Sequence, residues 1–188
     1  MVRLTNRTVG RLFLGRRMRS CGLGPLFTVA DDSGTTLQEP AFCATSCQSI
    51  PQGVLIECPP LPCIVNAVIT LQPGESALQQ WNGLYQLNRT LPVECGATGT
   101  GIECSQSLAV QPGSFTFTAM AGTGIDCSEF GDHTCTECMP DSNGGCTTYG
   151  AVVAGRLLPT VTSVALDASY GVGPSSAVPR PVELVFEE

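Results

Sequence analysis

The chain has 188 residues with a formal net charge of −7, and only 13% of its residues are charged. From residue 20 onward three Arg stand against sixteen Asp and Glu, so this part of the chain repels phosphate and a nucleic-acid partner is not expected. No apolar run approaches the roughly 20 residues that a membrane-spanning helix needs.

Cysteine is the most informative residue type in this composition. The chain contains 11 Cys, although a domain of this size can bury enough apolar surface to be stable without cross-links. Proteins of reducing compartments rarely carry so many Cys unless they bind metal, whereas exported proteins use Cys in disulfides. We therefore predict an exported protein that is periplasmic, anchored in the outer membrane or extracellular.

Residues 1–23 are basic and are predicted to lie outside the core. They contain six of the nine Arg and no acidic residue, which is typical of the start of an export signal. Three interpretations stay open: a degenerate twin-arginine signal introduced by Arg16-Arg17, a lipid anchor on Cys21, and a disordered tail behind a misassigned start codon. An unpaired Cys21 leaves an even number of Cys for disulfides.

Residues 24–188 are predicted to form a single all-β domain. Apolar and polar residues alternate with a period of two, turn residues separate the alternating segments, and no stretch has a sustained helical period. We expect an Ig-like antiparallel β-sandwich with long disulfide-stapled loops. The expected strands are Phe27–Ala30, Thr35–Leu37, Gly53–Glu57, Cys63–Leu71, Ala77–Trp81, Leu84–Leu87, Phe115–Met120, Val152–Leu158, Thr160–Leu166 and Val182–Glu187.

The stretch Leu71–Tyr85 contains the only Trp of the chain and two turn signals. Pro73-Gly74 predicts a turn after the strand that ends at Leu71. Asn82-Gly83 predicts a two-residue type I′ hairpin loop, because both residues tolerate positive φ. We expect Trp81, which lies between the two turns, to pack against the sandwich core rather than to bind a ligand.

Ten Cys are expected to form disulfides. Short intervening loops favour one bridge between Cys58 and Cys63 and another between Cys95 and Cys104. The segment at about 122–150 is predicted to be a Cys-rich insertion held by its own bridges. The ten residues are Cys43, Cys47, Cys58, Cys63, Cys95, Cys104, Cys127, Cys135, Cys138 and Cys146.

Four of these Cys are also candidate zinc ligands. Cys127, Cys135, Cys138 and Cys146 follow a symmetric C-x7-C-x2-C-x7-C spacing, and four thiolates can hold zinc in a tetrahedron. Zinc modules usually have two short knuckles, and this group has one, so disulfides are the favoured interpretation. A redox C-x-x-C is expected at a helix start after a strand, and the Gly-rich surroundings do not provide that context.

Other candidate chemistry has a simpler structural interpretation. His133 is the only His and has no nucleophile motif beside it. Asp141-Ser142-Asn143-Gly144 begins like a calcium loop but lacks the Glu that would complete it, so a turn is favoured. Asn6 and Asn88 begin N-x-T sequons, which matter only in a glycosylating secretory pathway. We predict no enzymatic activity and no cofactor.

The pattern L-x-P-G-E-S followed by W-N-G at Leu71–Gly83, then P-G-x-aromatic at Pro112–Phe115, resembles bacterial Ig-like sandwich domains. It is similar to the BsuPI-type proteinase inhibitor domain and resembles more closely the Cys-rich hypothetical lipoproteins of myxobacteria and their relatives. The resemblance covers Ile69–Met120 and implies a fold rather than an active site. No inhibitory residue follows from it.

The sequence favours a non-enzymatic, exported, disulfide-stapled β-sandwich that acts as a cell-surface or envelope interaction module or structural module. Its expected partner is a protein or another component of the envelope, with lipid anchoring at Cys21 as one form of attachment. One alternative is a protease inhibitor that presents a disulfide-closed loop, either Cys95–Cys104 or Cys127–Cys146. A second alternative is a zinc or redox protein that uses the Cys127–Cys146 group.

Overall fold

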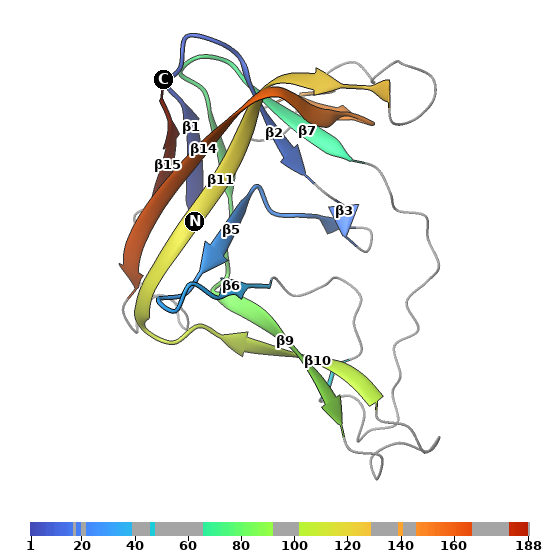
Figure 1. Ribbon diagram of the computed structural model, residues 1–188, viewed down its shortest axis with the longest axis vertical. Helices are drawn as coiled ribbons and strands as arrows, with labels where there is room; N and C mark the ends of the chain where they lie inside the picture. Colours follow the sequence, from blue (N-terminus) through green and yellow to red (C-terminus); the bar gives the residue numbers. More distant parts are fainter. Residues whose placement is uncertain are drawn as a thin grey trace.

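The computed structural model describes residues 1–16, 18–19, 22–38, 46–47, 66–91, 102–128, 139–140, 146–166 and 181–187. Within these residues the chain forms strands and no helix, which confirms the all-β prediction (Figure 1). The described part therefore contains no helix long and apolar enough to cross a membrane.

The described strands form two main sheets and two small ribbons. The three-stranded sheet contains, in order, β15 (Val182–Phe186), β1 (Val2–Asn6) and β8 (Ser76–Gln79). The eight-stranded sheet runs β12 (Met139–Pro140), β13 (Cys146–Tyr149), β7 (Ala67–Leu71), β2 (Leu12–Arg16), β11 (Gly113–Asp126), β5 (Phe27–Ala30) and β6 (Thr36–Leu37), and β14 (Val152–Leu166) pairs with β11. The ribbons are β9 (Leu84–Leu91) with β10 (Ile102–Ala109), and β3 (Met18–Arg19) with β4 (Gly22–Leu23).

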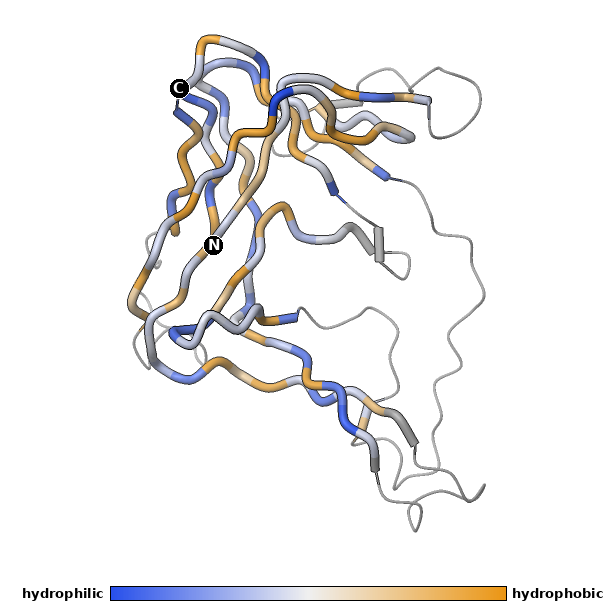
Figure 2. Tube along the Cα trace, viewed as in Figure 1, coloured by the Kyte–Doolittle hydropathy of each residue, from blue (hydrophilic) through white to orange (hydrophobic). Residues whose placement is uncertain are grey.

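One hydrophobic cluster joins the two main sheets and makes them a sandwich. Burial alternates along β1, β5 and β15, whereas every residue of β7 is buried. Figure 2 shows how the hydropathy of the residues changes along the chain. Phe117 is fully buried at the centre of an aromatic group, with ring centroids 5.1 Å from Trp81 and 5.9 Å from Phe27. Trp81 is only 7% exposed. The prediction that Trp81 packs against the core is confirmed.

The first strand of the chain lies inside the fold, contrary to the prediction for residues 1–23. β1 lies in the middle of the three-stranded sheet, parallel to β15 and antiparallel to β8 (Figure 1). Val2 and Leu4 have no exposed surface, and β2 adds two more core residues to the same hydrophobic cluster. The expectation that residues 1–23 lie outside the core is therefore wrong for β1 and β2. Two apolar residues separated by Arg3 are too short a pattern to indicate a buried strand.

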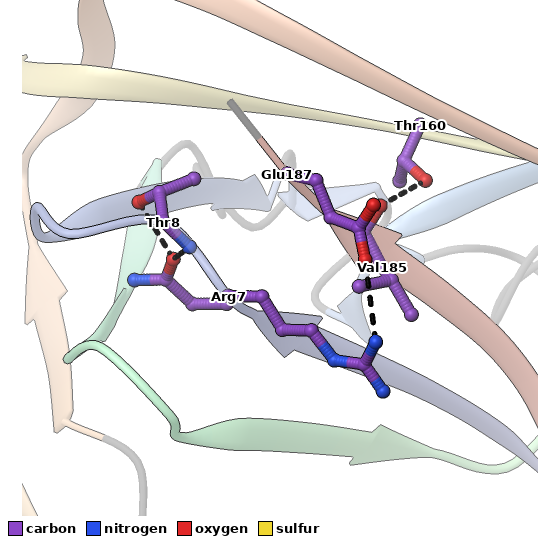
Figure 3. Close-up of polar contacts among 6 residues, drawn as sticks. Arg7, Thr8, Thr160, Val185 and Glu187 are labelled. Atoms are coloured by element: carbon purple, nitrogen blue, oxygen red, sulfur yellow. Dashed lines mark hydrogen bonds and ion pairs between the residues drawn. The ribbon is translucent and has the colours of Figure 1, made fainter.

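Two basic residues, one in β1 and one just after it, pair with acidic residues in and just after β15. Arg3 forms an ion pair with Glu183 at 3.0 Å. Arg7 forms one with Glu187 at 3.2 Å (Figure 3). All four side chains are substantially exposed, so each pair contributes at most about 1 kcal/mol. Burying Val2 and Leu4 contributes roughly 3–6 kcal/mol. Apolar burial therefore holds β1 in place, and the ion pairs favour its register with β15.

Asn6 ends β1 as a fully buried polar residue with all its hydrogen-bonding capacity used. Its Nδ2 donates to the carbonyl oxygens of Gly10 (2.8 Å) and Leu71 (3.0 Å). Its Oδ1 accepts from the backbone N–H (2.9 Å) and the hydroxyl (2.8 Å) of Thr8. A buried amide is tolerated only when it is paired in this way. Asn6 thus fixes the turn between β1 and β2 against the end of β7.

The turns of Leu71–Tyr85 form as predicted, but one expected hairpin does not. Gly74 has a φ of +83° in the Pro73-Gly74 turn, where the N–H of Glu75 donates to the carbonyl of Gln72. Asn82-Gly83 also turns the chain, with a φ of +68° at the glycine. However, β8 pairs with β1 and β9 pairs with β10, so no type I′ hairpin joins β8 to β9. The turn instead carries the chain from the three-stranded sheet into the β9–β10 ribbon.

Two predicted terminal features of the domain are confirmed. β5 and β6 pair as a hairpin, and β15 places Val182, Leu184 and Phe186 in the core. In the β5–β6 turn, Asp31 Oδ1 accepts hydrogen bonds from the Ser33 hydroxyl and from two backbone N–H groups. These bonds, the Ser33 hydroxyl first, lower the pKa of Asp31 below its ordinary value.

The main sheet extends into the segment predicted as an insertion, at both of its ends. β11 continues to Asp126 through a register shift between Gly122 and Gly124, and β13 pairs with β7. β14 is one strand of 15 residues rather than two strands. Thr160 donates a hydrogen bond to the carbonyl of Val185 at 2.7 Å, which joins β14 to β15 at the side of the sandwich (Figure 3). The predicted strand Gly53–Glu57 lies outside the described residues.

Leu4→Ala tests whether the amino-terminal strand belongs to the core. We expect a loss of about 2–5 kcal/mol in the free energy of unfolding, because a fully buried leucine leaves a cavity. The measurement is chemical denaturation followed by circular dichroism. Leu78→Ala on the neighbouring β8 is the matched control, since Leu78 is 37% exposed and should lose less than about 1 kcal/mol. Equal, small effects of both changes would contradict the placement of β1.

Candidate interaction surfaces

The predicted site residues divide between described and undescribed parts of the chain. Cys47 and Cys104 form a disulfide, and Cys127 and Cys146 are also disulfide-bonded. These four confirm their predicted use in disulfides. The residues that lie outside the described ranges are Cys21, Cys43, Cys58, Cys63, Cys95, His133, Cys135, Cys138 and the Asp141–Gly144 turn.

The Cys47–Cys104 bridge corrects the predicted pairing of Cys104. The short loop between Cys95 and Cys104 predicted a bridge between these two residues. In the structure the Cys104 sulfur bonds to Cys47, at an S–S distance of 2.05 Å and a sequence separation of 57 residues. Cys104 itself is buried. The β-bridge between Ser46 and Ser105 brings Cys47 beside Cys104, and loop length along the sequence could not predict this contact.

The disulfides in the structure argue against a zinc site at Cys127, Cys135, Cys138 and Cys146. Zinc takes Cys as thiolate, and the sulfurs of Cys127 and Cys146 are already in disulfides. Across the described residues, no three His, Cys, Asp or Glu side chains gather as a metal site. Two of the four candidate ligands therefore have no thiolate to offer.

The two sequons have opposite environments. Asn6 is buried and its amide is fully hydrogen-bonded, so a glycan cannot be attached without unfolding β1. Asn88 is exposed on β9. Of the two, only Asn88 presents its side chain to solvent.

The first candidate surface is the β9–β10 ribbon, which extends from one end of the sandwich (Figure 1). Its eight residue pairs run from Leu84 opposite Ala109 to Leu91 opposite Ile102. An isolated two-stranded ribbon is only marginally stable in water, so this ribbon needs attachments. Residues 92–101, which join its strands, lie outside the described residues.

Two attachments to other segments hold the ribbon. Near its base the N–H of Val110 donates to the carbonyl of Gly83 at 2.8 Å, which only extends the pairing of β9 with β10. On the β9 side the N–H of Gln86 donates to the carbonyl of Gln38, and on the β10 side the N–H of Cys47 donates to the carbonyl of Ser105. The Cys47–Cys104 disulfide reinforces the β10 side. The ribbon is therefore held on both edges rather than free to move as a loop.

The two faces of the ribbon differ in character. One face carries a hydrogen-bonded group in which Gln86 donates to Ser105 and Asn88, and Ser105 donates to Asn88. The other face carries Tyr85 opposite Leu108, followed by Leu87, which is 37% exposed. Figure 2 shows that the far part of β9 is strongly hydrophilic. The first face can recognise a partner through hydrogen bonds, and the second can do so through a small apolar contact.

The second candidate surface lies on the solvent side of β5, β11 and β14, and we name it the outer β11–β14 face. It carries three of the most exposed large apolar side chains: Met120 at 48%, Leu157 at 54% and Val161 at 65%. Paired hydroxyl groups lie beside them, such as Thr116 with Ser163 at 3.1 Å. The strand registers place these residues on one side: Thr28, Ala30, Ser114, Thr116, Thr118, Met120, Leu157, Pro159, Val161, Ser163 and Ala165.

The alternation of residues along β11 already indicates this face in the sequence. Thr116, Thr118 and Met120 alternate with the buried Phe115 and Phe117, so they had to face away from the core. The sequence alone does not show which strands pair with β11. Pairing with β14 and β5 gathers separate, weakly apolar strand faces into one surface.

Comparisons with protein-family models, with curated proteins and with solved structures found no match to this chain. The assignment of function therefore rests on the geometry of the two surfaces and on the disulfides.

Replacing both Cys47 and Cys104 by Ala should loosen the ribbon. Opening a loop of 57 residues costs at most about 4 kcal/mol of stability. Trypsin cleavage provides the local measurement, because Arg89 lies exposed in β9. We expect faster cleavage after Arg89 in the variant and an unchanged rate after Arg156, which is exposed in β14. Equal cleavage rates after Arg89 in both proteins would show that the bridge does not hold the ribbon.

Proposed function

We propose that this chain is an exported, disulfide-stapled, Ig-like β-sandwich that acts as a non-enzymatic interaction module at the cell surface or in the envelope. The observation that carries the proposal is the β9–β10 ribbon attached through Cys47–Cys104. A disulfide between segments so far apart in the sequence persists in an oxidising compartment and is rare in a reducing one. A ribbon held on both edges offers a partner a surface with little conformational entropy to lose.

The proposal does not include a lipid anchor at Cys21. Lipid attachment to such a Cys follows cleavage of the chain immediately before it. That cleavage would remove β1 and β2, and with them the buried residues Val2, Leu4, Leu12 and Leu14. A protein processed in this way would lose the middle strand of its three-stranded sheet. Export without this processing is the form that agrees with the fold.

Protease inhibition is the second candidate function. The observation in its favour is that attachments hold both strands of the β9–β10 ribbon. Inhibitors that occupy an active-site cleft need a rigidly supported segment, because a flexible segment loses affinity through ordering and is cleaved. A panel of serine, cysteine, metallo- and aspartic proteases tests this function. Inhibition of one class that Cys47→Ala/Cys104→Ala removes would support it, and cleavage of the ribbon by every class tested would exclude it.

Export is tested by the state of the Cys residues in cells. We expect the protein isolated from its native host to be fully disulfide-bonded except for Cys21, because the described Cys are bonded. Alkylation in intact cells followed by mass spectrometry, with and without prior reduction, counts the free thiols. One labelled thiol supports the proposal. Many labelled thiols, or zinc bound in stoichiometric amount, would place the protein in a reducing compartment and overturn it.

The role of the ribbon is tested by site-specific photo-crosslinking. A photoreactive amino acid at Leu87 should crosslink one envelope component in intact cells, because Leu87 lies exposed on the ribbon. The matched control is the same amino acid at Leu78, which has the same 37% exposure but lies on β8. A product that forms from Leu87 and not from Leu78 supports the proposal. Equal products from both positions, or none from either, would contradict a role for the ribbon.

A further inference from the structure

The β9 strand of the ribbon carries an N-x-T sequon formed by Asn88, Arg89 and Thr90, and all three residues are exposed. The asparagine of such a sequon is the residue on which an exported protein receives a glycan. The sequon at Asn6 begins instead with a buried side chain. Of these two sequons, the fold leaves the one on β9 accessible to a modifying enzyme.

The side-chain amide of Asn88 is held through its oxygen atom, and its nitrogen atom is left unused. Asn88 Oδ1 accepts hydrogen bonds from Gln86 Nε2 at 3.4 Å and from the hydroxyl of Ser105 at 3.2 Å. Asn88 Nδ2, the atom that carries a glycan, donates no hydrogen bond in the described structure. Asn6 is the opposite case, because its Nδ2 donates to two backbone carbonyls. A glycan on Asn88 therefore breaks no hydrogen bond of the fold.

Asn88 also lies where the ribbon has an open edge. The N–H of Gln86 donates away from β10, to the carbonyl of Gln38, and the outward-pointing backbone groups of a paired strand recur at every second residue. Because β9 pairs with β10 without a register shift, the backbone groups of Asn88 and Thr90 also point away from β10. No described strand pairs with this edge beyond Gln86. An exposed edge invites pairing with another chain, and covering it prevents that pairing.

We propose that Asn88 is an N-glycosylation site, with its glycan on the polar face of the β9–β10 ribbon. In the reaction, Asn88 Nδ2 forms a bond to C1 of a sugar, and the bond between C1 and the phosphate oxygen of a lipid-linked sugar diphosphate breaks. The electron pair of the broken bond leaves with the diphosphate, and Nδ2 passes one proton to the transferase. This inference rests on the proposed export of the chain, because the modification belongs to secreted proteins.

A glycan on Asn88 leaves the apolar face of the ribbon open to a protein partner. Successive residues of a strand point to opposite faces, so Leu87 and Tyr85 lie on the face opposite to Asn88. The face that receives the glycan is already polar, since Gln86, Asn88 and Ser105 form a hydrogen-bonded group there. A hydrated glycan therefore displaces no apolar contact, and the partner contacts the face that carries Leu87.

Peptide mass spectrometry of the chain isolated from its native host is the first test. The peptide that contains Asn88 should carry a glycan, and the peptide that contains Asn6 should carry none. Treatment with a peptide-N-glycosidase converts a glycosylated asparagine to aspartate and so marks the modified position in the fragment spectrum. An unmodified Asn88 in protein whose Cys47 and Cys104 are bonded would overturn the proposal and leave the proposed export standing. An unmodified Asn88 together with free thiols at both Cys would overturn both.

Substitutions at Thr90 are the second test, because they change the sequon without changing Asn88. Thr90→Val keeps the β-branched shape at an exposed strand position but removes the hydroxyl group that the sequon requires, so the glycan should be lost. Thr90→Ser keeps the hydroxyl group and is the matched control, which should stay glycosylated. Both variants are produced in the native host, and their circular dichroism should match wild type. Equal glycosylation of the two variants would overturn the assignment of the site.

Discussion

The parallel pairing of β1 with β15 is the contact on which the described fold depends most. It places the first strand of the chain between its last strand and β8, and so completes a three-stranded sheet from segments that are far apart in the sequence. Val2, Leu4 and the apolar residues of β15 then cover the core side of the larger sheet. Without β1, β15 and β8 would have no common neighbour in the described structure, and the buried aromatic group around Phe117 would lose part of its cover.

The pairing of β1 with β15 gives the basic residues near the amino terminus a structural role. Counted along the sequence, Arg3 and Arg7 belong to an Arg-rich start that resembles a signal. In space they lie beside Glu183 and Glu187. The exposed ion pairs add little free energy, but like charges at these positions would oppose the parallel register. The uneven distribution of charge along the chain therefore becomes local pairing of opposite charges when the two ends meet.

The sequence predicted those parts of the fold that depend on local pattern. Alternation placed Phe115, Phe117 and Ala119 in the core, and turn residues located the β5–β6 hairpin and the Pro73-Gly74 turn. The predictions were wrong where they required knowing which strand or which Cys a segment pairs with. Asn82-Gly83 has the residues of a hairpin loop, yet its flanking strands pair elsewhere. Cys104 bonds to Cys47 rather than to its neighbour in sequence. The candidate surfaces were missed for the same reason, since long-range pairing creates both of them.

Functional surfaces on this sandwich follow from the same long-range contacts. The ribbon is held by Gln38, Cys47 and the turn after β8, and the outer face exists because β14 pairs with β11. Both surfaces depend on the packing of the two main sheets against each other. β1 is needed for this packing because it is the middle strand of the three-stranded sheet. Hydrogen–deuterium exchange measured by mass spectrometry tests this most directly. The amides of Val2–Asn6 should exchange as slowly as those of Phe115–Ala121, because both strands are paired on both sides. Rapid exchange of Val2–Asn6 with continued protection of Phe115–Ala121 would show that the first strand is not part of the fold.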